Sequence, residues 1–232
     1  MKTRVVPAFV AVSTAFLVSP SAQAHHGLDF LLVQTAHLPE RGEAYAFART
    51  DHFAETQAET EFEPAVLYAA TDWMSLELHG HWAKHEGEST EFESIAPAAY
   101  FRLTPRGQTF AAGLAIEYEF AQSDDHEDAV ELASLFGYEA SDWIVAANLI
   151  YAKEQHASGE WAYAAGFRYN LNARHALGIE AAGSLESGGS SEAMVGYYGT
   201  FSEAFTWNVG IGTGIDDGPD WTARTALIWR FR

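Results

Sequence analysis

Three histidines and two glutamates lie close together in residues 74–86, which read MSLELHGHWAKHE. If this stretch is a β-strand, residues two positions apart share a face, with side chains about 6–7 Å apart. The imidazoles of His79 and His81 are then close enough to bind one ion. Zinc or copper would require a third ligand from a neighbouring strand. Candidates for that ligand are Glu61, Glu63 and Glu117. The alternative is a polar wall that uses histidine without a metal.

A second metal-binding feature depends on how the chain begins. Residues 1–24 combine a basic start, an apolar run and an A-x-A pattern, which together predict a secretory signal peptide. The alternative is an uncleaved anchor helix. Cleavage after Ala24 would leave His25 with a free α-amine beside its imidazole, and His26 follows at once. Amine and imidazole ligands suit Cu(II). The alternative is a pair of incidental histidines in a mobile terminus.

Composition narrows the class of protein. The chain has no cysteine, so it has no disulfide framework. Its formal charge of −19 becomes −21 once Lys2 and Arg4 are removed, which argues against a nucleic-acid partner. The chain is 48% hydrophobic and 14% aromatic, yet after residue 24 it has no apolar run long enough for a spanning helix. These properties indicate a membrane protein built from strands.

From residue 43 onward, segments of about ten residues alternate between bulky and small side chains. In residues 109–120, Leu114 and Ile116 lie on one face, whereas Gly113 and Ala115 lie on the other. The bulky face carries aromatic residues toward its ends, as the girdles of membrane barrels do, and the small face suits a crowded or water-filled interior. We therefore predict an all-β fold, an antiparallel transmembrane β-barrel of about 12 strands. The predicted strands are residues 43–54, 59–69, 74–86, 91–103, 109–121, 128–139, 143–154, 160–171, 175–185, 192–201, 205–215 and 221–231.

The connections predict how this barrel is oriented. Tight turns alternate with longer, more acidic loops, as expected for short periplasmic turns and longer external loops. An even number of strands allows a closed barrel in the outer membrane of a Gram-negative-type bacterium. Residues 25–42 fall outside the strand count and form either a periplasmic segment or a strap that enters the lumen. The expected organisation is a signal peptide at residues 1–24, an N-terminal segment at residues 25–42 and a barrel at residues 43–232.

The same alternation predicts which polar side chains line the lumen. They are Glu77, His79, His81, His85, Glu117, Glu119, Arg168, Arg224 and Arg230. Charges of both signs inside a barrel usually form interstrand ion pairs that set the polarity of the pore. No arrangement of nucleophile and base is evident, so we expect no enzymatic activity. We expect no cofactor either, unless the histidines bind copper or zinc.

Three functions remain open at this point. The leading hypothesis is a channel or transporter for a small solute, with a lumen that favours cations because it is acidic. One alternative is a metal-binding outer-membrane protein. Its ligands would be His25, His26, His79, His81 and His85. The other alternative is a structural barrel that acts through its external loops.

The acidic loops bear on the partners. Residues 122–128 and 216–220 lack the regular ligand spacing of a calcium-binding loop. We expect them to be solvated and bridged to lipopolysaccharide through divalent ions. Membrane lipid and lipopolysaccharide are thus the expected partners, together with a small solute. The sequence gives neither the solute nor the oligomeric state.

Three short motifs resemble a known family. Residues 38–42 read LPERG before the first predicted strand, and residues 64–73 read PAVLYAATDW across a strand and its turn. The chain ends in an aromatic strand, WRFR at residues 229–232, although the usual last residue is aromatic rather than arginine. These features are similar to a family of outer-membrane transporter barrels named after the meta-pathway of phenol degradation. The resemblance implies an outer-membrane location and solute passage, and it identifies no functional residue.

Overall fold

The structure is a computed structural model that describes residues 28–54, 58–123, 126–216 and 218–231. In this part of the chain, twelve strands form one closed antiparallel barrel, and each strand pairs with its neighbours along the chain. The strands are β1 (Ala44–Ala54), β2 (Glu59–Ala69), β3 (Met74–His85), β4 (Glu91–Arg102), β5 (Phe110–Ala121), β6 (Ala129–Glu139), β7 (Trp143–Glu154), β8 (Glu160–Asn170), β9 (His175–Ser184), β10 (Ser191–Ser202), β11 (Phe205–Ile215) and β12 (Trp221–Phe231). The predicted fold class and strand number are confirmed.

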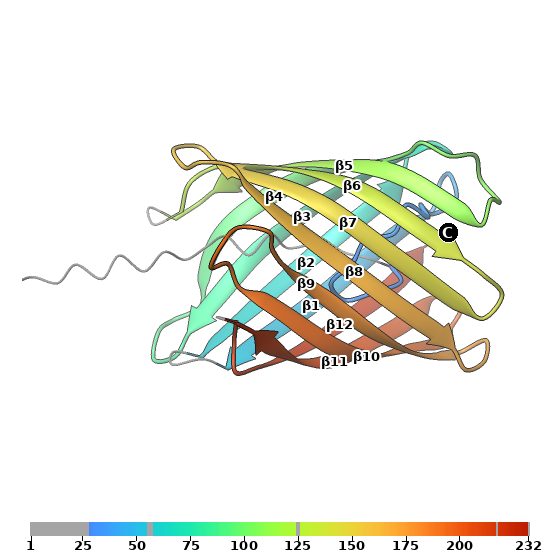
Figure 1. Cartoon of the computed structure of the whole chain (residues 1–232). Coiled ribbons are helices and arrows are strands. Elements are labelled where there is room, and N and C mark those ends of the chain that lie inside the picture. The colour runs from blue at the N-terminus through green and yellow to red at the C-terminus, as the bar shows by residue number, and fades with distance from the viewer. Residues whose placement is uncertain (1–27, 55–57, 124–125, 217, 232) are drawn as a thin grey trace, which may run out of the picture.

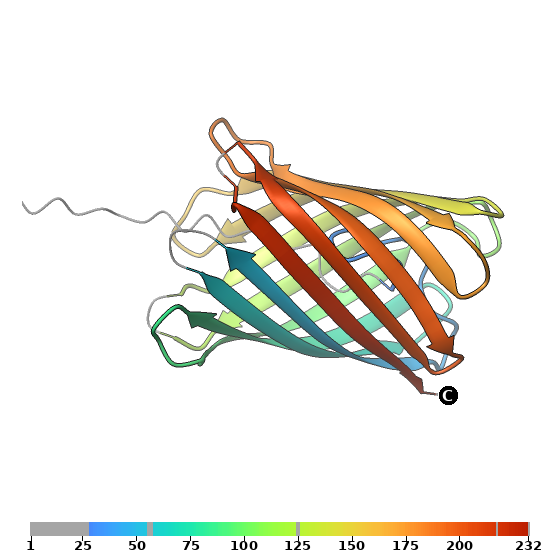
Figure 2. The same ribbon diagram turned by 90° about the horizontal axis from the view of Figure 1, so that it is seen from below.

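The first and last strands close the barrel. β1 pairs with β12 along its whole length, from Ala44 opposite Phe231 to Ala54 opposite Trp221. The strands are inclined to the barrel axis, as closure of a sheet requires (Figures 1 and 2). Because every strand has two neighbours, the sheet has no open edge whose backbone groups would face hydrocarbon.

Each strand separates an inner face from an outer face, as β7 illustrates. Ile144 and Asn148 are buried, whereas Val145 and Leu149 on the opposite face are exposed. Successive side chains of a strand point to opposite faces, so a period of two in hydrophobic bulk gives one lipid-facing and one luminal surface. The inner face uses many small residues, which leaves room for chain inside the barrel.

The outer surface is apolar over most of the barrel. Large hydrophobic side chains are exposed on every strand from β2 to β12, among them Leu132, Ile179 and Val195. A monomer in water rarely exposes a contiguous apolar patch larger than a few hundred Å². Aromatic residues such as Trp161 and Tyr169 are exposed toward strand ends. This surface is that of a membrane-spanning barrel.

In the described residues, no helix has the length and apolar character needed to cross a membrane.

The two ends of the barrel differ in their connections. Short turns, such as residues 140–142 and 171–174, lie at the end where the C-terminus lies, which we call the turn end (Figure 1). Longer connections, such as residues 122–128 and 185–190, lie at the opposite end, which we call the loop end.

Residues 28–39 run inside the barrel and form what we call the luminal segment (Figures 1 and 2). Five successive residues from Phe30 to Gln34 are buried, although none of them belongs to a strand. The segment leaves the lumen at the turn end, where Gly42 takes a positive φ of 88° just before β1. The hydrophobic core of this protein therefore lies between the luminal segment and the inner wall.

The fold places Leu149 of β7 on the lipid-facing side, and this placement can be tested. Replacing Leu149, in the middle of β7, by arginine places a charge in the hydrocarbon. We expect Leu149→Arg to lower the free energy of unfolding from lipid vesicles by about 2–4 kcal/mol, measured by reversible urea unfolding. The matched control is Leu171→Arg beside the turn end, which should cost about 0–1 kcal/mol because the charge can reach the interface. Equal costs at both positions would contradict the proposed depth of β7.

Candidate functional site in the barrel lumen

Close packing against glycines seats the luminal segment on the wall. A Cβ atom added to Gly166 of β8 would lie 2.9 Å from the ring of Phe30 and 3.2 Å from Val33. A Cβ atom on Gly210 of β11 would lie 2.7 Å from Leu31. The contacts with Phe30 and Leu31 are shorter than a Cβ atom normally makes, so a larger residue at either position would force the segment or its side chains to shift.

Two wall residues satisfy backbone groups of the luminal segment. The buried carboxylate of Glu180 on β9 accepts hydrogen bonds from the amides of Leu31 at 2.9 Å and Leu32 at 2.6 Å. The side chain of Asn148 on β7 accepts from the Gln34 amide and donates to the Gln34 carbonyl, both at 2.9 Å. Buried backbone groups need partners, and here side chains supply what a neighbouring strand would otherwise supply.

Arg168 on β8 holds the start of the segment. Its guanidinium donates to the Asp29 carbonyl at 2.9 Å and lies 3.1 Å from the Asp29 carboxylate. The same group lies over the rings of Phe30 and Tyr198, 5.9 and 5.6 Å from their centroids, which is within cation–π range. The Tyr198 hydroxyl in turn donates to Glu180. One connected network therefore fixes residues 29–32.

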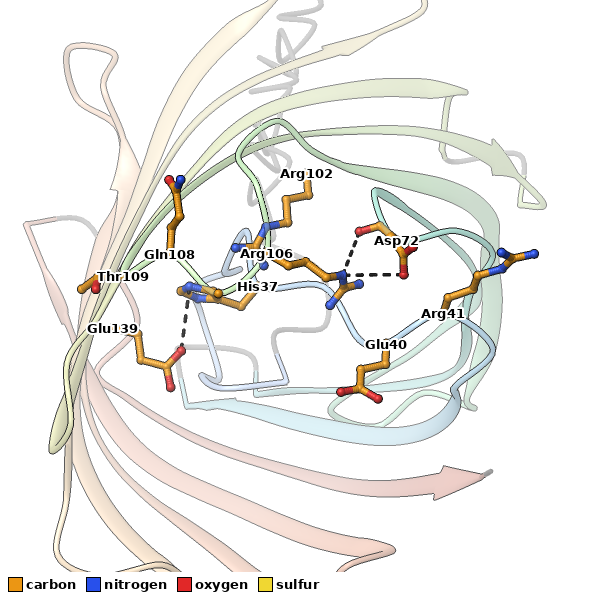
Figure 3. A pocket seen from close by; sticks show the side chains of 10 residues that line it. His37, Glu40, Arg41, Asp72, Arg102, Arg106, Gln108, Thr109 and Glu139 are labelled. Atoms are coloured by element: carbon orange, nitrogen blue, oxygen red, sulfur yellow. Dashed lines mark hydrogen bonds and ion pairs between the residues drawn. The ribbon is translucent and has the colours of Figure 1, made fainter.

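A polar cavity of about 700 Å³ opens beside the segment at the turn end (Figure 3). Arg106, in the β4–β5 turn, donates to the backbone carbonyls of Leu38, Pro39 and Asp72, and so ties the exit of the segment to two turns. Across the cavity, His37 lies 3.9 Å from Glu139. The cavity is lined by His37, Glu40, Arg41, Asp72, Arg102, Arg106, Gly107, Gln108, Thr109 and Glu139.

Farther inside, a small cavity lies beside the segment. A cavity of about 10 Å³ lies between Gln34 and the wall residues Tyr100 and Glu117. That volume is room for about one water molecule. The luminal segment therefore packs closely against the inner wall at the level of Gln34.

The predicted histidine wall faces inward, but the two central imidazoles contact different carboxylates. His79 lies 3.3 Å from Glu77 on its own strand and 3.7 Å from Glu117 on β5. All three side chains are buried. His79 and His81 therefore lie on the same face of β3, but their imidazoles contact different neighbouring side chains.

His81 belongs to a second group nearer the loop end. Its Nδ1 lies 3.0 Å from Glu93 on β4, and its Nε2 lies 3.6 Å from Glu61 on β2. The other carboxylate oxygen of Glu93 lies 3.3 Å from His126, in the β5–β6 loop. This hydrogen bond raises the pKa of His126 above its ordinary value, against the smaller opposing effect of burial.

Arginine–carboxylate pairs occupy the neighbouring part of the wall, on β10, β12, β1 and β2. Asp51 on β1 pairs with Arg49 on the same strand and with Arg224 on β12. Arg224 also pairs with Glu192 on β10, and Arg49 lies 3.4 Å from Glu63 on β2. Buried charges are stable only when paired, and this alternating row pairs each of them.

Arg230 pairs with Glu43 just before β1, at the turn end. Burial alone would raise the pKa of Glu43. Hydrogen bonds from the Glu40 amide, Arg230 and Tyr45 outweigh that effect together and hold the pKa below its ordinary value. The pair therefore joins the entry of the first strand to the end of the last.

The other predicted site residues lie as follows. Glu119 is half-buried on the inner face of β5, and His85 is exposed where β3 ends, 3.7 Å from Glu59. His25 and His26 fall outside the described residues. Alternation did not single out Glu180, Asn148 and Tyr198, three of the residues that hold the luminal segment. For Glu180, the signal available in the sequence was a large polar side chain on a face otherwise built from Ala, Gly and Ser.

Comparison with known proteins adds a fold likeness. No protein-family model matches the chain, and no curated protein is significantly similar to it in sequence. Among solved structures, it resembles the KdgM porin in complex with disordered oligogalacturonate, with a TM-score of 0.66 and 11% identity over 81% of this chain and 99% of that one. An outer-membrane channel from Pseudomonas putida F1 gives 0.66 and 11% over 84% and 97%. The NanC porin gives 0.60 and 8% over 79% and 98%. At these identities the likeness concerns the twelve-stranded fold.

Proposed function

We propose that this protein is a non-enzymatic outer-membrane channel for a small solute, closed by its luminal segment in the conformation described here. The observation that carries the proposal is an apolar outer face combined with an inner face rich in buried ionisable groups. A barrel that served only as a scaffold would have no need for buried charge, which is costly unless paired. Polar interiors are typical of membrane barrels that pass solutes. The likeness to porin folds and the expected signal peptide support the outer-membrane location.

The way the luminal segment is attached supports a reversible closure. Its backbone bonds to the wall run through Glu180 and Asn148 rather than through strand pairing. Each such hydrogen bond contributes only about 0.5–1.5 kcal/mol net, or somewhat more to a charged group. Release of the segment would leave the barrel ladder intact, so it can occur by local opening well below the cost of global unfolding. Its freed backbone would then be solvated in a water-filled lumen.

Charge supports a preference for cations. Among the described residues, buried carboxylates outnumber buried arginines. The carboxylates are Glu43, Asp51, Glu61, Glu63, Glu77, Glu93, Glu117 and Glu180, and the arginines are Arg49, Arg102 and Arg224. An acidic channel wall with low dielectric around it attracts cations and repels anions. We therefore keep a small cation, or a solute with a cationic group, as the proposed cargo.

Hydrogen exchange and planar-bilayer recording of one variant test whether the luminal segment closes the channel. Glu180→Ala removes the acceptor of two segment amides and should speed their hydrogen exchange about tenfold or more, since unsatisfied buried donors cost about 1–3 kcal/mol. We expect the same variant to raise the open probability of the refolded protein well above that of the wild type. The matched control is Glu160→Ala, which removes a carboxylate at the loop end of the same wall.

Folding is checked separately by the heat-dependent shift in gel mobility. If Glu180→Ala folds, exchanges its segment amides faster and still shows no openings, the channel proposal is wrong.

Reversal potentials in a salt gradient test the preference for cations. We expect the open protein to be more permeable to K⁺ than to Cl⁻, with a preference that weakens as ionic strength rises. The double variant Glu77→Gln/Glu117→Gln keeps side-chain size and removes two buried charges, so the permeability ratio should fall severalfold. Glu91→Gln, at an exposed position of the loop end, is the control and should change little. An anion-selective wild type would contradict this part of the proposal.

A further inference from the structure

A group of imidazole and carboxylate side chains lies at the loop end of three adjacent strands. Glu59 begins β2, His85 ends β3, and Glu93 lies near the start of β4. One ligand atom from each of the three side chains lies within 4.8 Å of the others. Glu59 and His85 are direct cross-strand partners, so the register of the sheet holds them side by side. Of these three residues, only Glu93 also belongs to the buried carboxylates that support the preference for cations.

An irregularity in the sheet directs the Glu93 side chain toward Glu59 and His85. His81 pairs with Ser94, but the next residue, Trp82, pairs with Phe92, so β4 carries one extra residue at Glu93. As a result Glu93 and Ser94 are both buried although they are consecutive. Bulges are found next to functional sites, where they redirect a side chain. Without this bulge the alternation of β4 would direct Glu93 to the lipid.

The contacts around Glu93 resemble the surroundings of a metal ligand. One carboxylate oxygen lies 3.0 Å from His81, and the other lies 3.3 Å from His126. His81 also lies 3.6 Å from Glu61. Partners that orient a ligating side chain through its second polar atom are typical of metal sites. His126, from the β5–β6 loop, contacts Glu93 and so contributes to its orientation.

The donor set favours one class of ion. Imidazole nitrogen with carboxylate oxygen suits zinc and similar divalent transition metals, whereas calcium and magnesium prefer oxygen alone. Ligand atoms around a tetrahedral zinc ion lie about 3.4 Å apart, given bonds of about 2.0–2.2 Å. Three donors already within 4.8 Å of one another reach that spacing through rotation of the glutamate side chains.

We propose that Glu59, His85 and Glu93 bind a divalent transition-metal ion of the zinc type at the loop end of the lumen. The site differs from the one that the sequence suggested, which combined His79 with His81. The proposed site lies closer to the loop end, and its ligands come from the three strands β2, β3 and β4. This inference is independent of the channel proposal, because equilibrium binding of the ion requires no conduction.

Competition with a chromophoric zinc chelator tests the site on the folded full chain in detergent. We expect binding of Zn²⁺ that weakens at least tenfold in His85→Ala and in Glu93→Gln. The matched control is His156→Ala, which removes an exposed loop imidazole whose partner is Glu127. The control should bind Zn²⁺ as the wild type does.

A background variant, His25→Ala/His26→Ala, removes the N-terminal histidine pair that the sequence suggested as a copper chelator. If the background variant still binds Zn²⁺, the result supports the site. If the background variant loses Zn²⁺ binding and His85→Ala alone does not weaken it, the proposed site is wrong. Absence of Zn²⁺ binding to the wild type also overturns it. Co²⁺ substitution gives a second readout, because absorption bands of tetrahedral Co²⁺ that disappear in His85→Ala require this imidazole as a ligand.

Discussion

The need to satisfy every backbone hydrogen bond in hydrocarbon determines the rest of this structure. No water is present there to replace a missing partner, so the sheet must close on itself. The β1–β12 pairing achieves this closure from Ala44 opposite Phe231 to Ala54 opposite Trp221. A closed sheet has one outer and one inner face, and successive residues must alternate between them. The lipid thus fixes the outer residues, while the inner positions are free to carry polar side chains.

The luminal segment meets the same requirement without a strand. Its amides and carbonyls are buried in the barrel, and the wall supplies Glu180 and Asn148 as partners in place of a ladder. Glycines at positions 166 and 210 let the segment approach closely enough for those bonds to form. The wall is therefore built to receive this particular stretch of chain. Packing and polar partners together hold it, yet neither involves the strand pairing on which the barrel depends.

Sequence reasoning succeeded where the lipid imposes a period of two, and it failed where that period is broken. The alternation in β7 distinguishes Leu149 from Asn148 without a structure. Glu93 could not be placed in this way, because one extra residue in β4 reverses the face on which it lies. A bulge depends on how two strands are paired, and the sequence of one strand does not contain that information.

The luminal segment was ambiguous for a different reason. Residues 28–35 are apolar enough to be a strand or a strap, and their burial depends on space inside the barrel that only the assembled sheet defines. The role of Glu180 depends in turn on where the segment lies. Its inward direction follows from the alternation of β9, but its partners, the amides of Leu31 and Leu32, are 149 and 148 residues away in the chain.

The charges of the lumen are arranged so that its two sides respond differently to a cation. On β10, β12, β1 and β2, Asp51, Glu63 and Glu192 are paired with arginines, whose charge is permanent. On β3, β4 and β5, the carboxylates of Glu93 and Glu117 face imidazole nitrogens instead of guanidinium groups. Carboxylate and imidazole groups can both coordinate a metal ion, whereas a guanidinium cannot. A bound metal ion would therefore interact mainly with the β3–β5 side, while the arginine side holds the barrel wall together.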